Sequence, residues 1–361
     1  MKFKQKLHIL EWLFPKNTRR RSILGLFIRI LLSPYYYVFN KKAFYEQVVY
    51  NLALIQYKNN PTACEAAIKR FMLGDKHRFY VIKCPSLYDS GLFFSVIRQI
   101  NHVFYAVVKG MIPVIDMKNY QNPYLDEDKV GKENAWQYYF LQPCGYELDD
   151  ITGLDTTYSF DAYPSIVSWQ LQKSTSGKNY DNRFQVGSLI FKHFFKLNED
   201  ALKYIEEEYQ RLIKPGMRVL GVSLRGTDYF KARGHQIQPK VNDVIAKVRE
   251  VMVLWNCDYI FLKSEERKTT NMFMEAFPGK VLRSDSVFYD DDLDDDYRLN
   301  ISVKFNRDND TYLKGLEYLT AIIILSRCTS AVMGHNSGSM SALYINGGQY
   351  ENTYIYDLGV V

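Results

Sequence analysis

The stretch that decides the fold is Gly221-Val222-Ser223-Leu224-Arg225-Gly226-Thr227-Asp228-Tyr229. It continues an apolar run that begins at Arg218, and such a run predicts a buried strand. Arg225 follows the carboxyl end of that strand, with Gly226 and Asp228 close behind. Ligands of parallel α/β sheets bind at this end of the strands. The stretch therefore predicts a parallel sheet with a polar site at its edge.

Apolar strands alternate with helical patterns on both sides of this stretch. Downstream, strands are expected at 259–263, 280–284, 330–334 and 353–358, separated by helices at 239–255, from 265, at 310–326 and from 337. Upstream, the strand 78–84, the helix 91–109 and the strand 111–117 form a unit whose crossover implies parallel pairing. A helix from Asn198 to about residue 213 separates the two series. The sequence predicts the α/β class, with two Rossmann-like doubly wound domains facing each other across a cleft.

The positive charge of the chain is concentrated at its start. Residues 1–42 hold ten Lys and Arg side chains against the single acid Glu11, whereas the rest holds 36 basic and 39 acidic side chains. A nucleic-acid binder needs a basic surface on its folded body, so nucleic acid is not expected as a partner. The five cysteines are widely spaced without a CxxC pair, which favours a reducing, cytoplasmic location without disulfides or zinc.

The segment from Ser22 to Phe39 is apolar but is interrupted by Arg29 and Pro34. A spanning helix needs about 20 mostly apolar residues, so a membrane span is not expected, and neither is a signal peptide. Two interpretations stay open. The segment could lie on the inner face of an anionic membrane as a peripheral contact, or it could pack on the body with its arginines in solvent.

Arg225 suits a diphosphate, because a guanidinium can bind two phosphate oxygens at once and neutralise charge that develops on them. Gly226 allows the backbone to turn and approach the ligand. Asp228 could orient the guanidinium from behind. The alternative is an Arg225–Asp228 ion pair without a ligand.

The same residues carry a resemblance to the fucosyltransferase superfamily, whose strand ends in G-V-H-V-R-R-x-D. Gly221, Val222, Arg225 and Asp228 match that motif, whereas Ser223 replaces its histidine and Gly226 its second arginine. The resemblance implies that Arg225 holds the β-phosphate of GDP-fucose. It also implies that Ser223 takes over part of the role of the histidine in the nucleotide pocket.

Two further segments resemble the superfamily in order and spacing. Ser264-Glu265-Glu266 stands where the family has A-T-D-D, so the resemblance implies that Glu265 reads the guanine edge. An acidic first turn of a helix is the other interpretation of that segment. Gly334-His335-Asn336-Ser337-Gly338-Ser339-Met340-Ser341 opens a helix and fits a phosphate site. Gly338 and Ser339 are its expected ligands, with Ser341 behind them.

The amino-terminal half resembles bacterial polysaccharide fucosyltransferase-like sequences at Asp89–Phe93, Gly110–Asp116 and Glu133–Tyr139. The resemblance spans residues 78–361 and implies a GT-B arrangement. We expect a basic helical extension at 1–77, an acceptor-binding domain at 78–212 and a GDP-sugar-binding domain at 213–361.

The general base has two candidates: Asp89, in the loop after the first strand, and His235, in the loop after the arginine motif. Asp89 could instead be a helix N-cap. The acidic run from Asp290 to Asp296 contains D-x-D patterns, the metal site of GT-A transferases, but so dense a run is typical of a solvated loop. No metal and no other cofactor is expected.

Taken with these residues, the resemblance implies an inverting, metal-independent transfer of L-fucose from GDP-fucose to a glycan hydroxyl. The expected setting is the synthesis of bacterial surface polysaccharide, lipopolysaccharide or capsule, with a glycan acceptor that could be free or lipid-linked. A metal-dependent GT-A transferase and a non-catalytic glycan-binding or scaffold protein are the alternatives.

Overall fold

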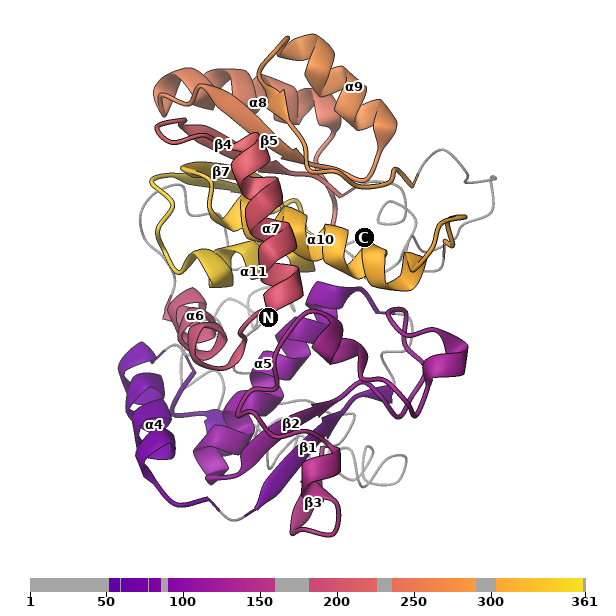
Figure 1. Ribbon diagram of the computed structural model, residues 1–361. Helices are drawn as coiled ribbons and strands as arrows, with labels where there is room; N and C mark the ends of the chain where they lie inside the picture. Colours follow the sequence, from indigo (N-terminus) through magenta and orange to yellow (C-terminus); the bar gives the residue numbers. More distant parts are fainter. Residues whose placement is uncertain are drawn as a thin grey trace, which may run out of the picture.

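The structure is a computed structural model, and it describes residues 52–58, 60–76, 78–85, 90–159, 182–225, 236–289 and 303–359. Two sheets lie at opposite ends of the described part, with helices between them (Figure 1). None of the helices in these ranges combines the length and the apolarity that a membrane span requires. The basic segment 1–42 lies outside the described residues.

The amino-terminal sheet consists, in the described ranges, of β1 (Phe79–Lys83), β2 (Ile112–Asp116) and β3 (Thr156–Tyr158). Their order is β2-β1-β3, and β1 pairs in parallel with both neighbours. Helix α5 (Leu92–Lys109) connects β1 to β2 and ends at Gly110, whose φ of 69° is the left-handed cap that glycine adopts without strain. The predicted strand–helix–strand unit is confirmed.

Within the residues that the structure describes, the carboxyl-terminal sheet has five parallel strands in the order β6-β5-β4-β7-β8. They are β4 (Val219–Ser223), β5 (Tyr259–Lys263), β6 (Val281–Leu282), β7 (Ser330–Gly334) and β8 (Thr353–Tyr356). The chain runs outward from β4 through β5 to β6 and then returns to the other side of β4 for β7 and β8. Strand order therefore reverses between β4 and β7, where doubly wound sheets bind ligands.

Helices cover both faces of this second sheet. α8 (Val241–Leu254) and α9 (Arg267–Ala276) lie on the outer face, at the top of Figure 1. α10 (Asp310–Ser326) and α11 (Ser337–Asn346) lie on the inner face, between the two sheets. α5, α6 (Asn182–Phe194) and α7 (Glu199–Leu212) complete this middle layer, and α4 (Pro61–Leu73) packs beside α5 and α6. All five residues of β4 and of β7 are buried, as expected for parallel strands covered on both faces.

Two glycines let α10 pack closely. A Cβ atom on Gly221 of β4 would lie 2.6 Å from Leu325 Cδ1 of α10, so the helix sits directly against the strand. A Cβ on Gly315 of α10 would lie 2.0 Å from the hydroxyl of Tyr139, which belongs to the amino-terminal half. Because α10 meets the sheet on one side and Tyr139 on the other, it joins the two halves.

One hydrophobic core runs through the middle layer. It contains α5 residues such as Val96 and Phe104 together with Ile322 of α10 and Met340 of α11.

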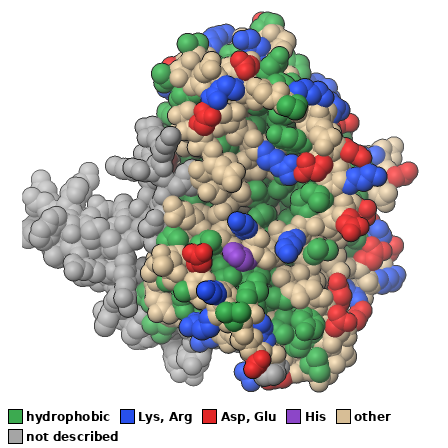
Figure 2. Space-filling view, turned by 60° about the vertical axis from the view of Figure 1, so that its left-hand side comes forward, with side chains coloured by type: hydrophobic (Ala, Val, Ile, Leu, Met, Phe, Trp, Pro, Cys, Tyr) green, Lys and Arg blue, Asp and Glu red, His purple; other side chains and the backbone are tan. Residues whose placement is uncertain are grey.

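On the face of the molecule shown in Figure 2, Lys and Arg side chains are scattered among hydrophobic patches and acidic side chains, in the part that the structure describes. The predicted α/β class with parallel sheets is confirmed. The predicted domain boundaries at 77/78 and 212/213 stay predictions. The hydrophobic core does not separate at 212, because it joins residues on both sides of that position.

Candidate functional site

Three neighbouring strands of the second sheet end side by side. Ser223 of β4 pairs in register with Lys263 of β5 and with Met333 of β7. The residues that follow these strands therefore meet at one edge. They include Arg225 after β4, Glu265 after β5 and the first turn of α11 after β7.

A carboxylate lies between two cations at this edge. Arg225 Nη1 donates to Glu265 Oε1 over 2.8 Å, and Lys263 Nζ donates to the same oxygen over 2.7 Å. The side chains of Arg225, Glu265 and Lys263 are 18 %, 12 % and 4 % exposed. One carboxylate thus balances one of two positive charges, and this group of three carries a net charge of +1.

Two tyrosines lie next to this charged group. Lys263 Nζ lies 4.9 Å from the ring centroid of Tyr318 on α10. The amide of Tyr289 donates to the carbonyl of Glu265 over 3.0 Å. Burial raises the pKa of the Tyr289 phenol, and the negative charge of Glu265 raises it further. Low solvent access strengthens electrostatic attraction to an anion at such an edge.

Tyr124 brings the amino-terminal half to the same place. Burial raises the pKa of its phenol; the charges of Arg225 and Glu265 also act on it, in opposite directions. Its hydroxyl oxygen accepts from the amide of Leu92 at the start of α5 over 2.6 Å. The next residue of α5, Phe93, packs edge-on against Tyr318 with ring centroids 5.1 Å apart. The start of α5 therefore borders the candidate site.

The first turn of α11 supplies backbone dipoles at the same edge. Asn336 is the N-cap, and its side-chain oxygen accepts from the amide of Ser339 over 3.0 Å. Ser339 Oγ donates to Ser223 Oγ over 3.1 Å, which ties the helix to β4. Gly338 approaches Tyr318 so closely that a Cβ would lie 2.5 Å from its hydroxyl. Ser337 is the half-buried residue of this turn, whereas Ser339 is fully buried.

An anion with two or more acceptor oxygens fits this arrangement. The site offers the guanidinium of Arg225, the ammonium group of Lys263 and the positive end of a ten-residue helix. Arginine binds such groups in a planar, bidentate way. The geometry therefore suits a phosphate or diphosphate better than a neutral ligand.

The predicted site residues divide into three groups. The structure brings Ser223, Arg225, Glu265, Gly338 and Ser339 to one edge, as their places after neighbouring strands require. Ser341 is 2 % exposed, and its hydroxyl has no hydrogen-bond partner within the described ranges. Asp89, Gly226, Asp228 and His235 lie outside the described residues.

Lys263, Tyr318 and Tyr124 also belong to this edge and were not predicted. Lys263 carries a signal in the sequence, since a lysine that ends the buried strand Tyr-Ile-Phe-Leu-Lys needs an anionic partner. No such signal marks Tyr318 or Tyr124 among 29 tyrosines.

No group of three or more His, Cys, Asp or Glu side chains suited to a metal ion occurs in the part of the chain that the structure describes. The acidic run from Asp290 to Asp296 lies outside that part. Metal independence therefore stays a prediction.

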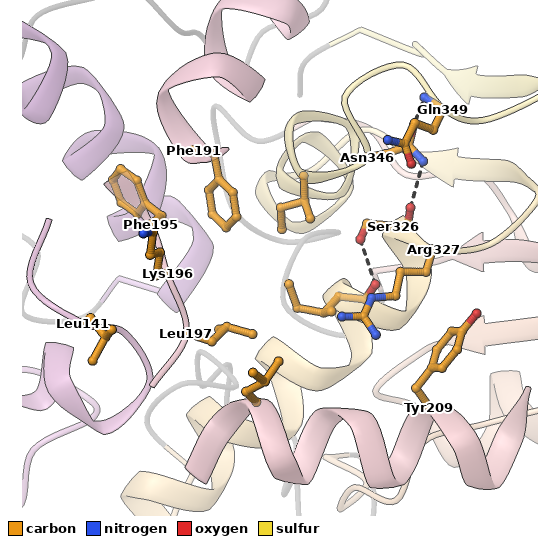
Figure 3. A pocket seen from close by; sticks show the side chains of 13 residues that line it. Leu141, Phe191, Phe195, Lys196, Leu197, Tyr209, Ser326, Arg327, Asn346 and Gln349 are labelled. Atoms are coloured by element: carbon orange, nitrogen blue, oxygen red, sulfur yellow. Dashed lines mark hydrogen bonds between the residues drawn. The ribbon is translucent and has the colours of Figure 1, made fainter. Parts of the chain in front are cut away.

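A separate cavity of about 840 Å³ lies where α6, α7, α10 and α11 approach one another (Figure 3). Its lining combines apolar side chains, among them Phe191, Phe195 and Leu197, with polar ones such as Ser326 and Arg327 at the end of α10. Asn346 Nδ2 donates to the carbonyl of Ser326 over 2.8 Å. Because α10 ends here just before β7 begins, the cavity lies at the amino ends of the strands, opposite the charged edge.

No protein-family model matches this chain, and no curated protein matches it. Among solved structures, the chain is similar to the NodZ α-1,6-fucosyltransferase soaked with GDP-fucose, at 14 % identity and a TM-score of 0.47; the match covers 79 % of this chain and 96 % of that one. A structure of NodZ from Bradyrhizobium gives 14 % identity, the same coverage and a TM-score of 0.45. A mutant of Arabidopsis thaliana FUT1 in complex with GDP gives 8 % identity over 86 % of this chain and 78 % of that one, with a TM-score of 0.42.

Proposed function

We propose that this chain is a glycosyltransferase that takes its sugar from a GDP-sugar, with GDP-L-fucose as the donor. One observation carries the proposal: Arg225, Glu265 and the start of α11 meet where the strand order of the second sheet reverses. Nucleotide ligands bind at this point in doubly wound sheets. The resemblance of the segment Gly221–Asp228 to the G-V-H-V-R-R-x-D motif selects GDP-fucose within that class.

In the proposed reaction, an acceptor hydroxyl attacks the anomeric carbon of the sugar from the side opposite the diphosphate. The carbon–oxygen bond to GDP breaks, the configuration inverts, and a general base takes the hydroxyl proton. Arg225 and the helix N-terminus stabilise the negative charge that develops on the departing GDP. Protein charges would thereby do what a metal ion does in GT-A transferases.

The acceptor would enter from the amino-terminal half, in a GT-B arrangement. Phe93 supports this direction, because it follows Asp89 by four residues and packs on Tyr318 at the edge of the site. Asp116, at the end of β2, is a poor candidate base. It is 2 % exposed, and its carboxylate already accepts from the amides of Lys118 and Asn119, each over 2.9 Å.

The wider setting belongs to the same proposal. A glycan acceptor in bacterial surface polysaccharide, held at the cytoplasmic face of the membrane, fits the basic segment 1–42, since polybasic segments bind anionic lipid. Co-sedimentation of the full chain and of a variant lacking residues 1–42 with anionic and neutral vesicles tests this step. Equal sedimentation of the two proteins with anionic vesicles would exclude it.

A panel of nucleotides and nucleotide sugars tests the donor. GDP and GDP-fucose should raise the midpoint of thermal unfolding, whereas UDP, CMP and their sugars should not. Saturating ligand at a hundredfold excess over Kd stabilises by about 2.7 kcal/mol, a measurable shift. Release of GDP from GDP-fucose, with and without glycan acceptors, then separates an enzyme from a glycan-binding protein. Stabilisation by UDP instead of GDP would refute the assignment.

A further inference from the structure

Lys263 is a buried cation at the sheet edge that carries the candidate donor site. It ends β5, its side chain is 4 % exposed, and it lies beside Ser223 in the pairing of β5 with β4. Its ammonium group donates to Glu265 and faces the ring of Tyr318. A buried ammonium group is costly to desolvate unless it is paired. A lysine at this buried position therefore requires the partners that surround its ammonium group.

Glu265 has to serve two cations. Its Oε1 accepts from Lys263 Nζ and from Arg225 Nη1. If Lys263 were absent, the charge of Glu265 would cancel that of Arg225, and the pair would offer little net attraction to an anion. With Lys263 present, Glu265 contacts two cations, and the three side chains together carry one positive charge.

We propose that Lys263 is a positioning residue of the diphosphate site. Its positive charge offsets the negative charge of Glu265, so that Glu265 can orient the Arg225 guanidinium without cancelling the attraction of the guanidinium for the diphosphate. The G-V-H-V-R-R-x-D motif has a second arginine at the position that Gly226 occupies in this chain. Lys263 would supply the positive charge that this difference removes. The inference rests on the proposed binding of a nucleoside diphosphate. It adds a residue and a charge balance that the motif does not contain.

The test varies the two charges separately and together. The variants are Lys263→Met, Glu265→Gln and the double variant of both, which has the same net charge as the parent. Lys314→Met is the matched control, because Lys314 is also 4 % exposed and also pairs with a carboxylate, that of Asp310 over 3.4 Å. Binding of GDP and of inorganic pyrophosphate is measured by calorimetry at two salt concentrations. Pyrophosphate has no base, so it reports the charge effect even if Glu265 also contacts guanine.

Lys263→Met should weaken pyrophosphate and GDP binding on the order of tenfold to a hundredfold. The double variant should bind pyrophosphate within about threefold of the parent, and Glu265→Gln should bind it more tightly than the parent at low salt. Lys314→Met should bind GDP as the parent does. If the single variant Lys263→Met fails to fold, Glu265→Gln is compared with the double variant instead. These two proteins differ only at position 263.

Each other outcome contradicts a specific statement. If Lys263→Met binds both ligands as the parent does while Arg225→Lys does not, the role of Lys263 is refuted and the proposed function stands. If the single variant loses binding and the double variant does not regain it, Lys263 acts through packing and the charge-offset proposal is wrong. If the parent binds neither GDP nor pyrophosphate, the proposed function fails, and the role of Lys263 with it.

Discussion

Ser339 Oγ, in the first turn of α11, donates to Ser223 Oγ, at the end of β4, over 3.1 Å, and both residues are 0 % exposed. This contact joins the helix to the strand at the point where strand order reverses. It involves the residue that replaces the histidine of the resembling motif. Ser223 therefore has a structural partner in this chain, whatever it contributes to the nucleotide pocket.

Removing one hydroxyl of this pair should destabilise the protein. Ser223→Ala leaves the buried Ser339 hydroxyl without its acceptor, and an unsatisfied buried polar group costs about 1–3 kcal/mol. Ser223→Ala/Ser339→Ala should be destabilised by less than the sum of the two single variants, because no hydroxyl is then left unpaired. Urea unfolding of the four proteins gives the coupling energy. Additive effects would show that the contact contributes no stability.

Arg225→Lys should lose most transferase activity, because an ammonium group cannot reproduce the planar two-pronged contact of a guanidinium. Removing a preorganised donor typically lowers kcat on the order of 10²–10³-fold. Arg218→Lys is the matched control: Arg218 precedes the other end of β4 and pairs with Glu351. GDP release is measured for both variants. Turnover of Arg225→Ala within a few-fold of the parent would refute the role of Arg225.

Activity should survive excess EDTA if protein charges replace the metal. Substitution of Asp290, Asp292, Asp294 and Asp296 together by Asn should then leave turnover largely intact, since a dense acidic run is expected to be solvated. Loss of activity in EDTA and its recovery with Mn²⁺ would favour a metal-dependent GT-A transferase instead.

The general base should be found by comparing Asp89→Asn with His235→Ala. A variant that lacks the base keeps its affinity for GDP and loses turnover by roughly 10²–10⁴. We favour Asp89, because the start of α5 that follows it borders the site through Phe93 and Tyr318. Near-parental rates in both variants would exclude both residues and point to a proton path through water or the acceptor.

His102 should make stability fall in mild acid. Burial, and next the charge of Arg98, lower its pKa from 6.5 to about 3. Below pH 6.5 the unfolded chain therefore binds a proton that the folded chain does not, and stability is lost as pH falls toward 3. This contribution changes by about 1.4 kcal/mol per pH unit. His102→Gln loses the contact with Tyr80 and should be less stable at pH 7, but the difference from the parent should shrink toward pH 4. A constant difference would contradict the shift.

The sequence predicts the strands of the second sheet well where they are buried. For Tyr259–Lys263 and Ser330–Gly334 the predicted bounds agree with the observed ones, because an uninterrupted apolar run between two turns defines both ends of a strand. The strand expected at 280–284 is only Val281–Leu282, since it pairs with a single neighbour and both residues are half exposed. Helix α6 was not predicted, and its modest apolar pattern explains why.

The candidate site was predictable as far as it follows from strand ends. Arg225 and Glu265 come together because β4 and β5 are neighbours in a parallel sheet, and alternation of strands and helices implies this. Tyr318 reaches Lys263 only because α10 packs against β4 at Gly221, and no local pattern encodes that approach.

Tyr318 lies at a position where one side chain contacts both halves of the molecule and the charged edge. Its ring meets Phe93 of the amino-terminal half, Lys263 of the second sheet and, through its hydroxyl, the space beside Gly338. Any rotation that separates Phe93 from Tyr318 would change the environment of a ring that also touches the charged edge. The signal of a fluorine atom placed on this one tyrosine would thus report both ligand binding at the charged edge and any change in the contact between the two halves.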